Sequence, residues 1–337
     1  MKKALIVIII IIIILSFSKL QQNDKDPIRS VTKSSTVSVR LKWLNQAQFA
    51  GLYVALDKKY YDDRGLDVTL KERDFALEKP VDEVVAGKAD FAIVSPEELL
   101  IARSEGKKVK AVAAFFQDTP AILISLERNL IRSPRDFSGK KIGIVTDSSE
   151  SRFIVKDLLK QFQIPEQEVK YVVVGSDQIE SLIRGDVDII LLYRTSGFAR
   201  LNNRGHDYVF IKPEEYGLIS YNDVLVVSES LIKEKPELVR GFVEASIAGW
   251  TYALTNEAET ITISHKYSNE KYRNREVLQS ILRQSNRLVK PSAEHKIGAM
   301  DSLKWRILLN KLNSQNIITE EIKINDMYTN EFLPKAE

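Results

Sequence analysis

The stretch that decides the fold is residues 42–68, which read KWLNQAQFAGLYVALDKKYYDDRGLDV. The residues before it, 37–41, alternate apolar and polar side chains, and this alternation predicts a half-buried strand. Apolar residues then recur at i, i+3, i+4 and i+7 from Phe49 to Leu56, so we expect a helix after the strand. Strand and helix are therefore joined by a short turn around residues 43–48.

That turn carries aromatic rings and amides, among them Trp43, Gln48 and Phe49. It follows the carboxyl end of a strand, which is where open α/β sheets bind their ligands. Aromatic rings can stack on a flat molecule, and amides can both donate and accept hydrogen bonds. The same residues can instead be core rings with solvated amides, and the composition of the turn leaves both interpretations open.

The order and spacing of these residues resemble the opening motif of the NMT1/THI5-like family. Gln-Phe-Ala-Gly, Tyr-x-Ala, an aromatic pair and Gly-Leu-Asp-Val follow the tryptophan here in the order of that motif. The family consists of solute-binding proteins that deliver thiamine-pyrimidine precursors and related small molecules to ABC transporters. The resemblance implies an α/β, periplasmic-binding-protein-like fold with two lobes, each a mixed sheet flanked by helices, and a ligand cleft between them.

Composition and charge narrow the class of protein. A chain of 337 residues is long for a single core, so two lobes are expected, and 44% hydrophobic with 28% charged residues is ordinary globular material. The formal net charge of +3 is spread along the chain, which argues against a nucleic-acid partner. The sequence has no cysteine and three widely separated histidines, so we expect neither a disulfide nor a metal site nor another cofactor.

The first residues have the pattern of a targeting segment. Lys2 and Lys3 precede an apolar run over residues 4–15, and Ser16-Phe17-Ser18 offers small residues for cleavage. Residues 1–18 are therefore predicted to be a signal peptide cleaved after Ser18 or an N-terminal anchor held through residues 4–18, and residues 19–36 a polar tether. Both alternatives predict a periplasmic or extracytoplasmic location.

Beyond the opening stretch, apolar runs at 68–70, 89–94 and 108–116 predict further strands. Ser95, Pro96 and Glu98 predict a helix start, with Ser95 as the cap and Glu98 completing a capping box. The backbone N–H groups of such a start can also face a ligand. Ser95 therefore has a structural and a functional interpretation.

After Pro120 the strand pattern restarts, with predicted strands at 141–146 and 187–193. The first opens into a hydroxyl-rich turn, which is typical of a helix cap and of a surface that grips a polar ligand. The second is followed by RTSG, where the family often has Asn-Glu-Pro. This departure leaves the identity of the ligand open. The predicted domains are lobe 1, residues 37–118 and 220–337, and lobe 2, residues 119–219.

The expected ligand site takes residues from both lobes, and Asn222 and Asp223 lie where the resemblance puts the strand that returns to lobe 1. Trp43 is expected to stack on the ligand, and Glu150 or Asp223 to accept a hydrogen bond from it. The candidate residues are Trp43, Gln48, Phe49, Ser95, Gln117, Ser148, Ser149, Glu150, Tyr193, Asn222 and Asp223.

Three functions remain open from the sequence. The first is capture of a small heteroaromatic or amine-bearing compound by a monomer that hands it to an ABC permease. The second is a ligand sensor that signals to a membrane partner. The third is an enzyme, but no nucleophile, Walker or zinc-hydrolase motif occurs. The pyrimidine-forming branch of the family uses a histidine beside the opening motif and a cysteine-rich signature, and this sequence has neither, so we expect no enzyme.

Overall fold

The computed structural model describes residues 34–145, 149–175, 177–201 and 204–335. The predicted signal or anchor segment, most of the predicted tether and Ser148 lie outside the described residues. In the described part, no helix is long and apolar enough to cross a membrane.

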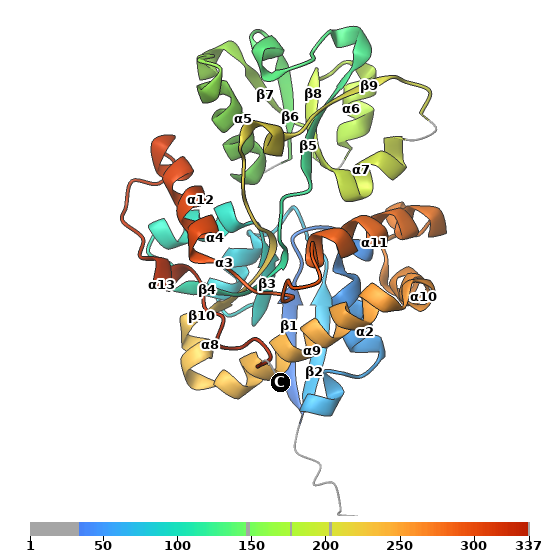
Figure 1. Cartoon of the computed structure of the whole chain (residues 1–337), viewed down its shortest axis with the longest axis vertical. Helices are drawn as coiled ribbons and strands as arrows, with labels where there is room; N and C mark the ends of the chain where they lie inside the picture. Colours follow the sequence, from blue (N-terminus) through green and yellow to red (C-terminus); the bar gives the residue numbers. More distant parts are fainter. Residues whose placement is uncertain (1–33, 146–148, 176, 202–203, 336–337) are drawn as a thin grey trace, which may run out of the picture. The chain divides into compact units, whose positions relative to one another are not determined.

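Ten strands in the described residues form two mixed sheets (Figure 1). The strands are β1 (Ser35–Arg40), β2 (Leu66–Lys71), β3 (Phe91–Val94), β4 (Val109–Phe116), β5 (Ala121–Leu126), β6 (Lys141–Ile144), β7 (Lys170–Val173), β8 (Ile189–Tyr193), β9 (Tyr208–Ile211) and β10 (Asn222–Ser228). The order is β2-β1-β3-β10-β4 in one sheet and β7-β6-β8-β5-β9 in the other. β10 runs antiparallel to β3 and β4, and β5 runs antiparallel to β8 and β9.

Helices flank both sheets, and each sheet with its helices is one lobe. Lobe 1 holds α2 (Ala50–Asp57), α3 (Pro80–Val85), α4 (Pro96–Ser104), α8 (Glu229–Glu234), α9 (Pro236–Thr255), α10 (Glu257–Tyr267), α11 (Arg275–Val289), α12 (Ser302–Ser314) and α13 (Ile324–Met327). Lobe 2 holds α5 (Ser149–Gln161), α6 (Gln178–Arg184) and α7 (Arg194–Leu201). β3 is apolar and buried along its whole length, because helices cover both faces of its sheet.

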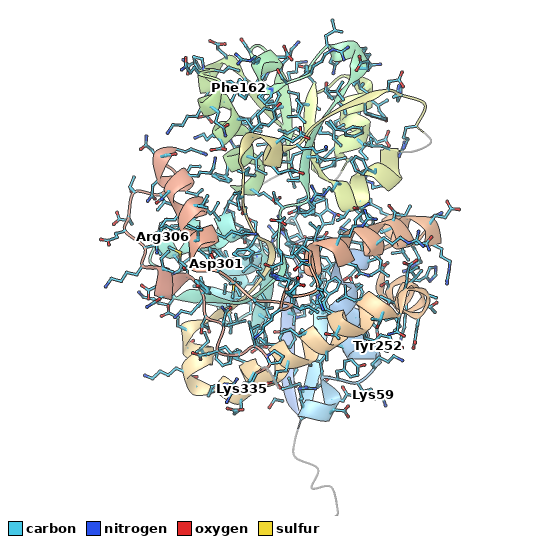
Figure 2. All side chains as sticks on the ribbon, in the orientation of Figure 1. Lys59, Phe162, Tyr252, Asp301, Arg306 and Lys335 are labelled. Carbon is cyan, nitrogen blue, oxygen red and sulfur yellow. The ribbon has the colours of Figure 1, made fainter. Side chains whose placement is uncertain are left out.

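Two segments carry the chain between the lobes. Residues 117–120 join β4 to β5, and residues 212–221 join β9 to β10. An apolar cluster also continues across this junction, because Val94 and Leu99 of lobe 1 belong to the same cluster as Phe137 and Phe153 of lobe 2. The exposed charged side chains lie on the outside of the fold, as Lys59, Arg306 and Lys335 show in Figure 2.

Helices α2 and α9 pack against each other at unusually short range. A Cβ built on Gly249 of α9 would lie 2.0 Å from the backbone oxygen of Gly51 on α2. A Cβ on Gly51 would in turn lie 2.3 Å from the ring of Trp250. Glycine at both positions is what allows the helix after the opening turn to lie directly on α9.

The structure corrects two local expectations. Ser95 caps α4 by accepting from the backbone N–H of Glu98, as predicted, but Glu98 does not complete a capping box. Its Oε1 instead accepts from the backbone N–H of Val81 at 3.3 Å, because α3 begins beside it. The short edge strand β9 was not predicted, since its burial alternates weakly and it lies outside the sheet's buried middle.

Candidate functional site

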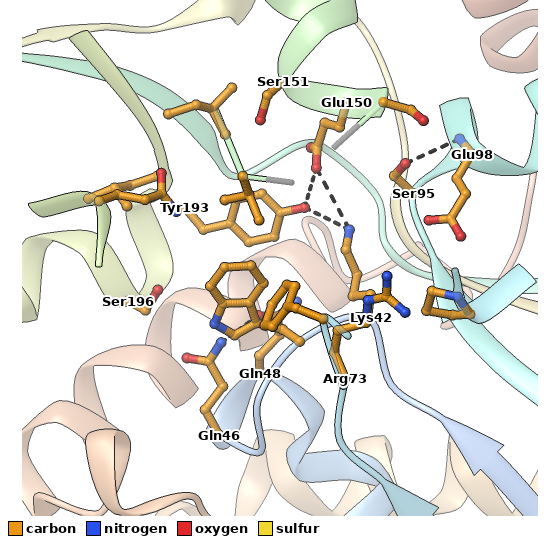
Figure 3. A pocket seen from close by; sticks show the side chains of 18 of the residues that line it. Lys42, Gln46, Gln48, Arg73, Ser95, Glu98, Glu150, Ser151, Tyr193 and Ser196 are labelled. Carbon is orange, nitrogen blue, oxygen red and sulfur yellow. Dashed lines mark hydrogen bonds and ion pairs between the residues drawn. The ribbon is translucent and has the colours of Figure 1, made fainter. Parts of the chain in front are cut away.

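A pocket lies between the two lobes and takes residues from both (Figure 3). Its empty volume, including the opening to solvent, is about 890 Å³. The lining residues are Lys42, Trp43, Gln46, Gln48, Arg73, Phe75, Lys79, Pro80, Ser95, Glu98, Val145, Ser149, Glu150, Ser151, Gln178, Leu191, Leu192, Tyr193, Ser196, Arg200 and Tyr272.

Lys42 is the centre of a hydrogen-bond network that joins the lobes. It follows β1, so the end of that strand directs it into the pocket. Its Nζ donates to the Tyr193 hydroxyl of lobe 2 at 2.7 Å and to Asn222 Oδ1 at 2.6 Å. It also lies 3.8 Å from a Glu150 oxygen and 3.7 Å from an Asp223 oxygen. One lysine therefore contacts both walls of the pocket.

Glu150 occupies the first turn of α5 in lobe 2 and is 7% exposed. Its Oε2 accepts from the Tyr193 hydroxyl at 2.6 Å, and its Oε1 accepts from Asn222 Nδ2 at 2.6 Å. The bond to Tyr193 lies within lobe 2, and the bond to Asn222 crosses the cleft, so this carboxylate joins the two lobes in addition to lining the pocket.

Burial shifts the pKa of several groups in this network. It raises the pKa of Asp223 to about 6, against the opposing effect of Lys42. Burial, reinforced by the charge of Glu150, raises the pKa of Glu97 to about 8. The pKa of Tyr193 lies well above its ordinary value because its hydroxyl is buried and faces Glu150 and Asp223. Burial therefore favours the neutral form of both carboxyls, while Lys42 opposes this effect at each of them.

An aromatic wall closes one end of the pocket. The Trp43 indole N–H donates to the Tyr272 hydroxyl at 2.9 Å, and Phe75 meets the Trp43 ring edge-on, with centroids 5.1 Å apart. The Arg200 guanidinium of lobe 2 lies 5.7 Å from the Tyr272 ring centroid. Since the polar edge of Trp43 is already bonded, the indole can offer a ligand mainly its face.

A chain of amides lies beside this wall. Asp223 accepts two hydrogen bonds from Gln48 Nε2, at 2.8 and 2.9 Å. Gln48 Oε1 accepts from Gln46 Nε2 at 2.9 Å. Gln46 and Gln48 both line the pocket, and Figure 3 shows them side by side below its centre. Gln46 Oε1 is buried and has no donor among the described residues.

The structure brings some of the predicted site residues into the pocket and not others. The predicted residues that line it are Trp43, Gln48, Ser95, Ser149, Glu150 and Tyr193. Asn222 and Asp223 stand behind that wall and bond to lining residues. Phe49 is packed in the core of lobe 1, and the Gln117 amide donates to the backbone oxygens of Ala114 and Ala299. Neither of these two lines the pocket, and Ser148 lies outside the described residues.

Sequence reasoning missed several lining residues. Lys42 and Gln46 belong to the opening stretch, and their position after β1 was a usable signal. Arg200 and Tyr272 had no such signal, because they come from distant segments that meet only in the folded chain. Among the described residues, no group of three or more His, Cys, Asp or Glu side chains could hold a metal ion.

Comparison with known proteins decides the family. A family model described as NMT1/THI5 like matches residues 46–260, more than half of the chain. The chain belongs to the NMT1/THI5-like family. The resemblance inferred from the opening motif is thereby confirmed.

Relatives in this family include binding proteins and enzymes. The chain is 27% identical to the riboflavin-binding protein RibY of Chloroflexus aurantiacus, over 88% of this chain and 86% of the relative. It is 22% identical to the formylaminopyrimidine-binding protein of Halalkalibacterium halodurans, over 87% and 89%. It is 23% identical to a 4-amino-5-hydroxymethyl-2-methylpyrimidine phosphate synthase of Legionella pneumophila, over 67% and 71%.

Solved structures show the same fold. The alkanesulfonate-binding protein SsuA of Xanthomonas axonopodis superposes with a TM-score of 0.70 at 12% identity, over 88% of this chain and 99% of that one. The periplasmic nitrate-binding protein NrtA of Synechocystis superposes with a TM-score of 0.65 at 10% identity, over 89% and 87%. The predicted two-lobed, periplasmic-binding-protein-like fold is therefore confirmed.

Proposed function

We propose that this protein is an extracytoplasmic solute-binding protein that captures a small heteroaromatic compound between its lobes and delivers it to an ABC importer. The observation that carries the proposal is the interlobe pocket, in which an aromatic wall from lobe 1 faces polar and charged groups from lobe 2. Two relatives match most of the chain, RibY and the formylaminopyrimidine-binding protein, and both are named for a ring compound that they bind.

The contacts of two cations that line the pocket, Lys42 and Arg200, support a neutral ring as the ligand. Lys42 is already paired with Glu150 and Asp223, and Arg200 lies against the Tyr272 ring. A ligand carrying a full negative charge would have to compete with these buried carboxylates for Lys42. A flat ring with polar edges can instead stack on Trp43 and bond to amide groups.

The share of the chain that each relative matches favours a binding role over a pyrimidine-forming role. Lys42 and Glu150 are bonded to Tyr193 and Asn222 on opposite sides of the cleft, an arrangement that ties two lobes around a ligand. The named synthase matches a smaller share of this chain than the two binding proteins do.

The test is a thermal-shift screen of the purified protein with riboflavin, 4-amino-2-methylpyrimidine and ethanesulfonate, followed by uptake of the stabilising compound in cells with and without the gene. We expect a ring compound to raise the melting temperature and uptake to fall when the gene is deleted. Stabilisation by ethanesulfonate alone would contradict the proposed ligand class. Conversion of a ring compound into a new product would contradict the binding role.

A further inference from the structure

We infer that Gln46 is a specificity residue whose side-chain carbonyl accepts a hydrogen bond from an N–H group of the ligand, so that the pocket selects ring compounds with an N–H donor on their edge. This inference rests on the proposed function, because it concerns the same pocket. It follows from a chain of three hydrogen-bonding groups, Asp223, Gln48 and Gln46, which we call the amide relay.

The relay has a fixed direction because it starts at a carboxylate. An ionised carboxylate can only accept hydrogen bonds, so Gln48 must turn its NH₂ group toward Asp223, as both contacts at 2.8 and 2.9 Å show. Gln48 is then left with its carbonyl oxygen for its next neighbour. Gln46 must meet that oxygen with its own NH₂ group, at 2.9 Å. Gln46 is left with one further N–H and with its carbonyl, and the carbonyl is its only acceptor.

Two features hold the starting carboxylate in place. Lys42 Nζ lies 3.7 Å from an Asp223 oxygen, which favours the charged form. Asp223 has a backbone φ of 47°, a left-handed conformation that few residues other than glycine adopt and that aspartate tolerates better than most. That conformation, at the start of β10, turns the Asp223 carboxylate toward Gln48.

The end of the relay points to a ligand. Gln46 is 2% exposed and lines the pocket, and no donor among the described residues reaches its Oε1. A buried carbonyl without a donor is costly, and an N–H group of a bound molecule would remove that cost. Gln178 of lobe 2 repeats the feature, since it also lines the pocket with a buried Oε1 that has no donor in the described part of the chain. Acceptors on both lobes fit a ring with N–H groups on its edge, such as an aminopyrimidine or an imide.

The experiment compares two pairs of probes in which methylation of one nitrogen removes its N–H donors. The first pair is 4-amino-2-methylpyrimidine and its N,N-dimethyl derivative, and the second is riboflavin and riboflavin methylated at its imide nitrogen. Calorimetry measures their affinities for the wild type, for Gln46→Met and for the control Gln167→Met, which makes the same change at an exposed position of lobe 2. Methionine matches the length of glutamine and removes the acceptor.

We expect the wild type and Gln167→Met to bind the N–H member of a pair at least about tenfold more tightly, and Gln46→Met to lose that preference. A preference that survives in Gln46→Met would overturn the inference. Binding of ethanesulfonate and of neither ring would also overturn it, while leaving a solute-binding function intact.

The hydrogen bonds of the amide relay can be measured without ligand. A negative result for the relay can therefore be distinguished from a negative result for the proposed function. In nuclear magnetic resonance spectra, the side-chain NH₂ proton of Gln46 that is bonded to Gln48 should exchange slowly with solvent. In Gln48→Met this proton should exchange quickly, and Gln167→Met should leave its exchange unchanged. Slow exchange that persists in Gln48→Met would show that Gln46 does not depend on the relay, and the inference would fail.

Discussion

Trp43 is the residue on which the proposed ligand rests most directly. Its indole N–H is bonded to Tyr272 and its ring is half-buried at the pocket wall, so the face remains for stacking. Trp43→Ala should weaken binding of the ring compound found by screening by roughly 1–3 kcal/mol, and Trp43→Phe should weaken it less because a ring face is kept. Calorimetry on folded variants measures both, and equal affinities for Trp43→Ala and the wild type would remove the stacking role.

Glu97 makes the stability of the protein depend on pH. It is 2% exposed, its Oε1 accepts from the Ser220 hydroxyl, and burial raises its pKa from 4.5 to about 8. A carboxyl whose pKa is higher in the folded than in the unfolded state stabilises the fold when protonated. That stabilisation is complete below about pH 4.5 and is lost as the pH rises through about 8.

Unfolding in urea should therefore show a free energy that falls by roughly 1–3 kcal/mol between about pH 6 and pH 8. Glu97→Gln should flatten this part of the curve, because glutamine stays neutral. At lower pH the free energy of unfolding should still fall with rising pH in the variant. The pKa of Asp223 is raised to about 6, so its carboxyl also stabilises the fold when protonated. An unchanged slope in Glu97→Gln would assign the effect to another group.

Among single residues, the sequence predicted those pocket-lining side chains whose place depends on a local pattern. Trp43 and Gln48 follow from a strand end and a turn with a recognisable order of residues. Phe49 belongs to the same motif but points into the core, because it begins the helical face that packs on lobe 1. The role of Gln46 could not be predicted, since it depends on Asp223, which lies 175 positions from Gln48 in the chain.

Among the elements, the contact between α2 and α9 positions the opening turn. Gly249→Ala would place a methyl group 2.0 Å from a backbone oxygen of α2, so the two helices would have to move apart. We expect the free energy of unfolding to fall by about 3 kcal/mol.

Gly241→Ala is the matched control on the same helix, because its nearest neighbours would lie at 3.6 Å. It should be neutral or gain up to about 1 kcal/mol from helix propensity. Equal losses in the two variants would contradict the close packing.

Long periodic elements were predictable, and short or edge elements were not. The strand predicted over residues 108–116 has a clear apolar pattern and forms as β4. β9 has four residues and one buried side chain, too little for a pattern to emerge. α7 begins directly after Tyr193, in the segment where the family motif departs, and its place in the pocket through Arg200 depends on the packing of lobe 2.

For the whole molecule, Glu150 is the residue through which lobe 2 takes part in the contacts between the lobes. Its contacts with Asn222 and Lys42 join lobe 2 to lobe 1 within the pocket. Glu150→Gln removes the charge that faces Lys42 and should lower the affinity for ligand by about 1–3 kcal/mol, because the closed arrangement becomes less favourable. Glu127→Gln, whose partner Arg132 lies in the same lobe and is exposed, is the control and should bind as the wild type does. Equal affinities in the two variants would show that the contacts of Glu150 between the lobes do not contribute to ligand binding.

We propose that the ligand is held between two lobes that close on it. Two connecting segments permit a hinge, and only a closed form lets a ligand contact Trp43 and lobe 2 together. The most direct test is small-angle X-ray scattering of the wild type with and without a saturating amount of the ring compound found by screening. We predict a smaller radius of gyration with ligand, and a smaller change in Glu150→Gln. An unchanged radius of gyration at saturation would contradict capture by closure.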